Sequence, residues 1–247
     1  MINQNRPIYL IEDRLHGHAF SSGAPHNTGF MVIGDPDSFA PHRTVVVAGM
    51  PRGGTTMVAE CLVNLGLPMG VPTPAPYNFE DPEFQELLHL ESPGPVDQPR
   101  LNSLIERRNA AHPVWGFKFP LAVNSLGILE GALRNPQFIL VFRDVAAAAA
   151  REVISIGMGA THAMRRGLVF QQRMIDFAES SGSPCMLLSY EKALQFPDVF
   201  VNLLVSWCAW PASREQTERA YATVEANRKQ YVSDTEKDGL RRIGLGS

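Results

Sequence analysis

The chain has 247 residues, of which 45% are apolar and 19% charged, and its formal net charge is −3. These values suit a globular protein with one sizeable core, and they exclude a general electrostatic attraction to nucleic acid. The sequence has no apolar run of membrane-spanning length and no secretory leader pattern. We therefore expect a cytoplasmic protein with no transmembrane segment, in which scattered cysteines such as Cys61 and Cys185 are buried, reduced thiols.

The first forty-three residues are rich in Gly, Pro, His and Asn, which predicts an irregular arm with one strand at residues 30–33. The apolar run 45–48 then predicts a strand of a parallel sheet that is covered on both faces. A helix is expected from Thr55 to Leu65, where Gly66 ends it.

The turn between this strand and this helix has the composition of an anion-binding loop. Gly49, Gly53 and Gly54 allow a sharp turn that exposes backbone N–H groups, and Thr55 and Thr56 are expected to cap the helix and to donate hydroxyl hydrogen bonds. The positive end of the helix dipole lies at the same place. These features predict a phosphate site.

The loop departs from the pattern of nucleoside triphosphate loops. That pattern, G-x-x-x-x-G-K-[ST], aligns with Gly49 and Gly54 but requires Lys at position 55, where this chain has Thr. The cation is instead Arg52, inside the loop, and an arginine forks onto phosphate without replacing that lysine. We therefore expect this loop to bind a 5′-phosphate, without the metal ion and the triphosphate group that such loops usually bind.

Proline-rich loops are expected over residues 67–99, interrupted by a helix that begins at Asp81 and Pro82, where Asp81 is the N-cap. A second apolar strand, residues 138–142, delivers Arg143 and Asp144 at its carboxyl end, the edge where α/β sheets bind ligands. The remaining helices are expected at residues 101–110, 121–133, 145–156, 161–180, 197–208 and 213–230.

Strands that alternate with helices predict an α/β protein with a three-layer P-loop NTPase-like fold, in which helices flank a central parallel sheet. The sequence has no clear linker, so we expect residues 1–247 to form one domain. Within it, residues 1–43 are the irregular arm, and the loops in 67–99 are expected on the acceptor side.

Four segments, in order, resemble PAPS-dependent sulfotransferases of the bacterial and Golgi type, which use 3′-phosphoadenosine 5′-phosphosulfate as donor. Residues 51–56 are similar to the 5′-phosphosulfate loop P-[KR]-S-G-T-[TS], with Gly53 for Ser. Residues 115–120 resemble a W-G-x-K-x-P strand, residues 138–144 the 3′-phosphate strand, and residues 186–193 a late Y-E-x-L segment that is structural in the family.

The resemblance implies sulfuryl transfer to a hydroxyl of a glycan, glycolipid or small metabolite, with PAPS as co-substrate and no metal. It implies that Lys118 and Arg52 act on the transferring group, and that the donor is bound by Arg52, Gly53, Gly54, Thr55, Thr56, Arg143 and Arg151. Arg151 stands where the family has a phosphate-binding Ser, and Ser155, one turn further on, is the alternative. Val145 replaces the usual Pro.

The resemblance leaves the general base open, because Pro120 stands where cytosolic animal enzymes have a catalytic His. Residues 78–84 resemble a region that supplies a Glu in some branches, which makes Glu80 the first candidate and Glu60 the second. His112 and His162 are further candidates. Basic residues that the phosphates could also attract are Arg165, Arg166, Arg241 and Arg242.

Two other functions remain open. A P-loop kinase-like phosphotransferase would need the lysine that the loop lacks. A non-catalytic nucleotide-binding protein of the same fold would explain the departures at Val145 and Arg151.

Overall fold

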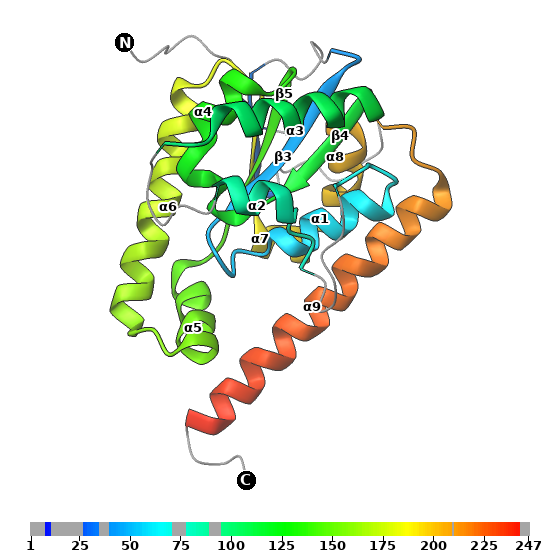
Figure 1. Cartoon of the computed structure of the whole chain (residues 1–247). Helices are drawn as coiled ribbons and strands as arrows, with labels where there is room; N and C mark the ends of the chain where they lie inside the picture. The colour runs from blue at the N-terminus through cyan, green and yellow to red at the C-terminus, as the bar shows by residue number, and fades with distance from the viewer. Residues whose placement is uncertain are drawn as a thin grey trace.

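The computed structural model describes residues 8–10, 27–34, 40–70, 78–88, 95–208 and 210–242, with the side chains of 8–10 and 230–242 excepted. The described residues form one six-stranded sheet with the order β1-β2-β6-β5-β3-β4. Figure 1 shows the sheet between two layers of helices. In the order of the sheet, the strands are Ile8–Leu10, Phe30–Ile33, Cys185–Ser189, Pro136–Phe142, Arg43–Gly49 and Val114–Lys118.

The predicted α/β class is confirmed, and the parallel sheet holds for four of the strands, β6, β5, β3 and β4. The other two strands differ from the prediction, because β2 pairs antiparallel with β6 and β1 pairs antiparallel with β2. The strand expected at residues 30–33 is confirmed as β2. The three-residue β1 in the arm was not predicted, since so short a run has no readable period.

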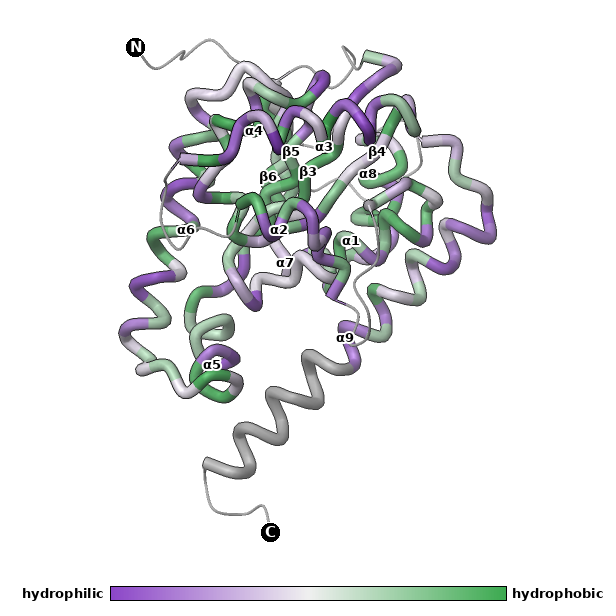
Figure 2. The backbone as a smooth tube through the Cα atoms, in the orientation of Figure 1, coloured by the Kyte–Doolittle hydropathy of each residue, from purple (hydrophilic) through white to green (hydrophobic). Residues whose placement is uncertain are grey.

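One layer of helices packs on one face of the sheet through a hydrophobic core that includes residues of β3 and β6. It is made of α1, α7, α8 and α9, which are Thr55–Asn64, Tyr190–Gln195, Pro197–Cys208 and Arg214–Arg242. The opposite core cluster takes its residues from α2, α3, α4 and α6, which are Pro82–Leu88, Gln98–Ala111, Leu126–Ala132 and Ala160–Ser180. In Figure 2 the apolar stretches of the chain gather on the central strands between these layers.

Three helices differ from their predicted bounds by more than one residue. Helix α3 begins at Gln98, inside the expected loop, because Asp97 caps it and Pro99 is tolerated in its first turn. The helix expected over 121–133 is a 3-10 helix, Pro120–Ser125, followed by α4. Helix α9 continues to Arg242, beyond the predicted end at residue 230. The helix expected over residues 145–156 is α5, Val145–Ile156, with Asp144 as its N-cap.

The chain order places a switch point between β3 and β5. From β3 the chain crosses to β4 on one side, and it then returns to β5 on the other side. Open α/β sheets bind ligands in the crevice outside the carboxyl ends of such strands. Here those ends are Gly49, which begins the glycine-rich loop, and Phe142, which precedes Arg143.

Cys61, Cys185 and Cys208 are free and buried, as expected for the first two. Burial raises the pKa of the Cys61 thiol above its ordinary range and that of Cys208 to about 12. Of the helices that the structure describes, none combines the length and the apolar content that crossing a bilayer requires.

Helix α2 is anchored on the sheet by one aromatic stack. The rings of Phe84 on α2 and Phe117 on β4 are nearly parallel, with their centroids 3.7 Å apart, and both side chains are buried. We expect Phe84→Ala to lower the free energy of unfolding by about 3–5 kcal/mol, because the cavity opens between helix and sheet. Urea denaturation measures this loss.

Glu86→Ala on the same helix is the matched control. Glu86 is exposed and its only described ion pair is with Arg100 at 2.7 Å, a surface pair worth at most about 1 kcal/mol. Equal losses in the two variants would contradict the anchoring role of Phe84.

Candidate functional site

The glycine-rich loop after β3 is a tight turn that leads directly into α1. The N–H of Gly53 donates to the carbonyl of Met50 at 2.9 Å, and Arg52 and Gly54 have positive φ angles of 59° and 91°. Helix α1 has Gly54 as its N-cap and no side-chain cap. Thr55 and Thr56 therefore lie in the first turn, which corrects the expected capping role. An uncapped helix N-terminus at a glycine turn is a general anion-binding arrangement.

Two glycines fix the shape of this loop. A Cβ on Gly54 would lie 2.1 Å from Cδ2 of Tyr190, the first residue of α7, so the backbone passes directly under that ring. A Cβ on Gly53 would lie 2.6 Å from the Met50 carbonyl oxygen. The departure from Ser at position 53 thus has a physical reason, since this turn has no room for a side chain there.

Lys118 ends β4 beside the loop, and its ammonium is buried. The register of the parallel pair places Lys118 opposite Val47, and only 2% of the lysine side chain is exposed. Its Nζ donates to the Asn78 carbonyl at 2.9 Å, to Glu80 Oε1 at 3.0 Å and to Thr56 Oγ1 at 3.4 Å. Lys118 is thus the last residue of β4, and its contact with a transferring group stays a prediction.

The electrostatics of Lys118 follow from this burial. Desolvation lowers the pKa of the ammonium, the Glu80 carboxylate opposes that shift by its charge and its hydrogen bond, and the positive charge of Arg52 adds to the lowering. Arg52 itself is exposed at the tip of the loop. Three of the residues expected from the sequence, Arg52, Lys118 and Glu80, thus act on one another.

The segment that carries Glu80 is held at both ends. On one side, the side chain of Asn78 accepts a hydrogen bond from the Glu80 backbone N–H at 3.0 Å, and the Asn78 carbonyl accepts one from Thr56 Oγ1 at 3.3 Å. On the other side, the N–H of Asp81 donates to the Lys118 carbonyl at 3.2 Å. The Glu80 side chain is 17% exposed, so its carboxylate lies at the edge of the buried cluster.

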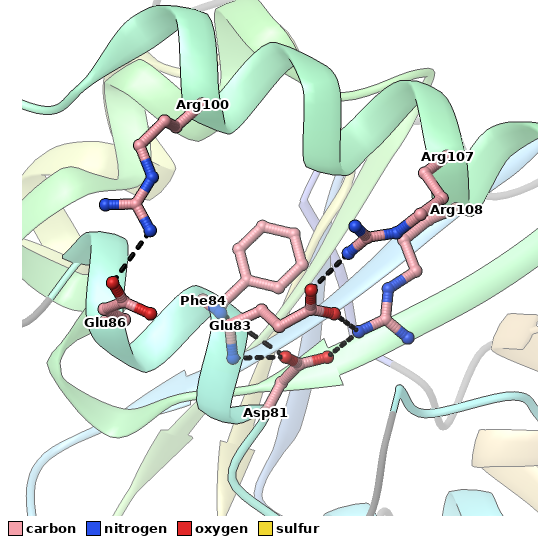
Figure 3. A network of polar contacts seen from close by, with 7 residues as sticks. All are labelled: Asp81, Glu83, Phe84, Glu86, Arg100, Arg107 and Arg108. Carbon is pink, nitrogen blue, oxygen red and sulfur yellow. Dashed lines mark hydrogen bonds and ion pairs between the residues drawn. The ribbon is translucent and has the colours of Figure 1, made fainter.

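Asp81 is confirmed as the cap of α2, and it also joins α2 to α3 (Figure 3). Its carboxylate accepts from the N–H groups of Glu83 and Phe84, at 3.0 and 3.3 Å, and pairs with Arg108 of α3 at 3.0 Å. Burial raises the pKa of the Asp81 carboxyl, and the positive charge of Arg108 opposes that shift. Asp81 therefore positions the neighbouring Glu80 through the backbone.

Arg143 lies beneath the loop rather than open to solvent. Its Nη1 donates to the carbonyl of Arg52 at 2.6 Å, its guanidinium is 4.8 Å from the ring centroid of Tyr190, and its Nε is 3.8 Å from Glu191 Oε1. The two segments expected to bind opposite ends of one nucleotide are thus in direct contact. Arg143 supports the loop from below, and its expected contact with a 3′-phosphate stays a prediction.

The other expected residues are dispersed. Glu60, the second candidate base, is half-buried and hydrogen-bonds Thr223 of α9. Arg151 is half-buried in the middle of α5, and its role stays a prediction. The remaining candidates, Ser155, His112, His162, Arg165 and Arg166, lie on α3, α5 and α6 or at their ends. Arg241 and Arg242 fall in α9, where their side chains lie outside the described residues.

Three residues of the site were not named from the sequence as binding or catalytic. Asn78 bonds both Lys118 and Thr56, Tyr190 covers Gly54, and Gln171 of α6 donates to the Arg143 carbonyl at 2.6 Å. Asn78 had a local signal, because an Asn two residues before Glu80 favours a turn closed by its own side chain. Tyr190 and Gln171 had none, since their roles depend on packing between distant segments.

Comparison with known proteins gives limited information. No family model matches the chain, and no curated protein matches it. Two similar solved structures are the sulfotransferase STF9 from Mycobacterium avium, with 12% identity and a TM-score of 0.49 over 75% of this chain and 68% of that one, and TT1252 from Thermus thermophilus, with 15% identity and a TM-score of 0.39 over 75% and 97%. Likenesses this weak carry no argument about what the chain binds or does.

The coupling between Lys118 and Glu80 can be measured directly. The charge of Glu80 and its hydrogen bond both raise the pKa of Lys118, so we expect Glu80→Gln to move the titration of this ammonium to lower pH. NMR of the labelled Lys118 side chain against pH gives the two midpoints. Glu83→Gln is the matched control, because Glu83 pairs instead with Arg107 and Arg108. Equal midpoints in wild type and Glu80→Gln would contradict the coupling.

Proposed function

We propose that this chain transfers a sulfuryl group from PAPS to a hydroxyl of a small molecule or a carbohydrate. The observation that carries the proposal is the cluster of Lys118, Glu80, Thr56 and Arg52 at the start of α1, beside a loop that resembles a 5′-phosphosulfate loop. The Gly53–Gly54 turn and the uncapped α1 fit a 5′-phosphate, because a Cβ at either glycine would close the turn.

The proposed reaction needs cations and one proton acceptor. The acceptor oxygen bonds to sulfur while the bond from sulfur to the bridging phosphate oxygen breaks, and the electron pair of that bond passes to the phosphate. In this scheme Lys118, Arg52 and the N–H groups of the loop stabilise the charge that develops on the bridging oxygen. Groups fixed before the reaction do this without reorganisation, and Lys118 is fixed by three acceptors, so it contributes its positive charge rather than a free N–H donor.

Glu80 is the proposed general base, and it takes the proton of the acceptor hydroxyl. The Glu80 side chain is partly exposed, so an acceptor can approach it from solvent, and its carboxylate pairs with Lys118. An acceptor oxygen hydrogen-bonded to Glu80 would therefore lie near the same ammonium that faces the loop. The rival candidate Glu60 is turned toward Thr223 of α9.

A second candidate function is nucleotide binding without transfer. It is favoured by the burial of Arg143, whose guanidinium bonds the Arg52 carbonyl, and by the Arg at position 151 where the family has Ser. In both functions Arg143 shapes the loop, and Arg151 is the proposed contact of the 3′-phosphate.

Binding measurements separate these functions from a kinase-like phosphotransferase. By isothermal titration we expect adenosine 3′,5′-bisphosphate to bind without metal and more tightly than ATP with Mg²⁺. Arg52→Ala should weaken that binding about 10–100-fold, the range for a hydrogen bond between charged groups. Arg107→Ala, which removes an exposed arginine of α3, should leave it unchanged. A preference for ATP with Mg²⁺ would support the phosphotransferase, and it would contradict the proposal.

Transfer itself is tested with a labelled donor and a panel of hydroxyl acceptors. We expect Lys118→Met to lower kcat by ~10²–10³, as for the loss of one preorganised group that stabilises the transition state. Glu80→Gln should lower it by ~10²–10⁴, the usual contribution of a general base. Glu83→Gln, which changes an acid three residues further on, is the control. Normal transfer by Glu80→Gln would remove Glu80 from the role of base, and bisphosphate binding without transfer to any acceptor would favour the second candidate.

A further inference from the structure

Helix α5 and the first two thirds of α6, residues 145–173, form a helical hairpin whose outer part extends beyond the sheet (Figure 1). Much of the exposed apolar surface of the described residues lies on it. Of their nine exposed large apolar side chains, five belong to this hairpin: Val153, Ile154, Ile156, Leu168 and Val169. Ile154 and Ile156 are 63% and 61% exposed, and Figure 2 shows the hydrophobic stretch of α5. Single exposed apolar residues are ordinary, but a cluster of this kind marks an interaction surface.

The same hairpin is cationic in a chain whose net charge is negative. Residues 145–173 contain four arginines and one acid, Glu152, which gives a formal charge of +3 against −3 for the whole chain. Glu152 is buried and pairs with Arg166 at 2.9 Å. The one acid of residues 145–173 is thus already paired with one of the four arginines.

Three of the four arginines line a hollow between the end of α5 and the exposed face of α6. The hollow measures about 580 Å³, and its lining combines Arg165, Arg166, Arg173 and His162 with apolar side chains such as Ile156 and Val169. The guanidinium groups of Arg166 and Arg173 lie 5.3 and 5.9 Å from the centroid of the Phe170 ring. An anionic group would meet the exposed Arg165 there, together with the guanidinium groups of Arg166 and Arg173, which also donate to Glu152 and Asn124.

This arrangement differs from that of the arginines on the other surface helices. On α3 and α9, arginines pair with carboxylates of the same or a neighbouring helix, as in Arg100 with Glu86, Arg107 with Glu83, Arg214 with Glu218 and Arg219 with Glu215. Arg165, by contrast, is exposed and has no ion-pair partner among the described residues. Its position on the rim of the hollow leaves it available for an external anion.

We propose that the α5–α6 hairpin docks on the surface of an anionic phospholipid bilayer. The hollow takes headgroup phosphates, and the exposed side chains beside it, Ile156 and Val169 among them, enter the boundary between headgroups and acyl chains. A cationic face next to an apolar one is the general signature of helices that lie in this interface. A second copy of the chain fits less well, because a symmetric contact would set the +3 charge of one hairpin against that of the other.

The test is sedimentation of the full chain with vesicles of phosphatidylcholine alone and with vesicles that also contain phosphatidylglycerol. We expect binding to the anionic vesicles, much weaker binding to the neutral ones, and a loss of binding as salt is raised. Arg165→Gln should weaken binding about fivefold, the effect of one arginine near an anionic surface. Ile156→Ser should weaken it through the loss of apolar insertion. The matched controls are Arg107→Gln on α3 and Val63→Ser on α1, both exposed in the folded chain.

The remaining outcomes overturn the proposal. Binding that is equal on both kinds of vesicle, or absent on both, rules out an anionic bilayer as the occupant. Displacement from vesicles by millimolar glycerol phosphate would show a site for a soluble anion. Self-association of the wild-type chain that Ile156→Ser abolishes would show that a second copy covers the hairpin. None of these results depends on whether the chain transfers sulfate, because the vesicle experiments contain neither PAPS nor an acceptor and the variants leave the loop, Lys118 and Arg151 unchanged.

Discussion

The buried ammonium of Lys118 is the interaction on which the arrangement of the site depends. A buried charge lowers the stability of the fold unless it is paired and hydrogen-bonded. The groups that bond Lys118 are therefore held in place by the same requirement. Those partners come from two segments, the first turn of α1 with Thr56 and the approach to α2 with Asn78 and Glu80. One strand end thereby fixes the helix that follows the loop and the segment that carries the carboxylate. The ion pair between Asp81 and Arg108 extends this hold to α3.

Much of the fold was readable from the sequence, and the reasons are local. The apolar runs that became β3, β5 and β6 are each bounded by turn residues, and the helix of residues 145–156 was predicted at its observed bounds. The antiparallel addition of β2 to β6 was not readable, because it joins segments more than 150 residues apart whose only common signal is apolar character. The early start of α3 differs from the prediction because Pro99 is a common loop signal, although proline is also tolerated in a first helical turn.

The site shows the same division between local and distant information. The residue types at positions 52, 80 and 118 each indicated a role in binding or catalysis. Nothing in the sequence, however, indicated that Lys118 contacts Glu80, which lies 38 residues earlier. Arg143 was expected to face a ligand because strand ends do so in α/β sheets. Its actual direction is decided by the Arg52 carbonyl and the Tyr190 ring, which belong to two other segments. The direction of a side chain at a strand end therefore depends on the other segments that surround it in the folded protein.

The close passage of the loop backbone under Tyr190 has a consequence for how this protein can vary. Position 54 has no space for a methyl group while an aromatic ring occupies position 190, and Arg143 is stacked near that same ring. Substitutions at these three positions are therefore not independent. A larger residue in place of Gly54 would need a smaller one in place of Tyr190 and also a different backbone angle, because φ at position 54 is 91°, so homologous chains should retain this glycine.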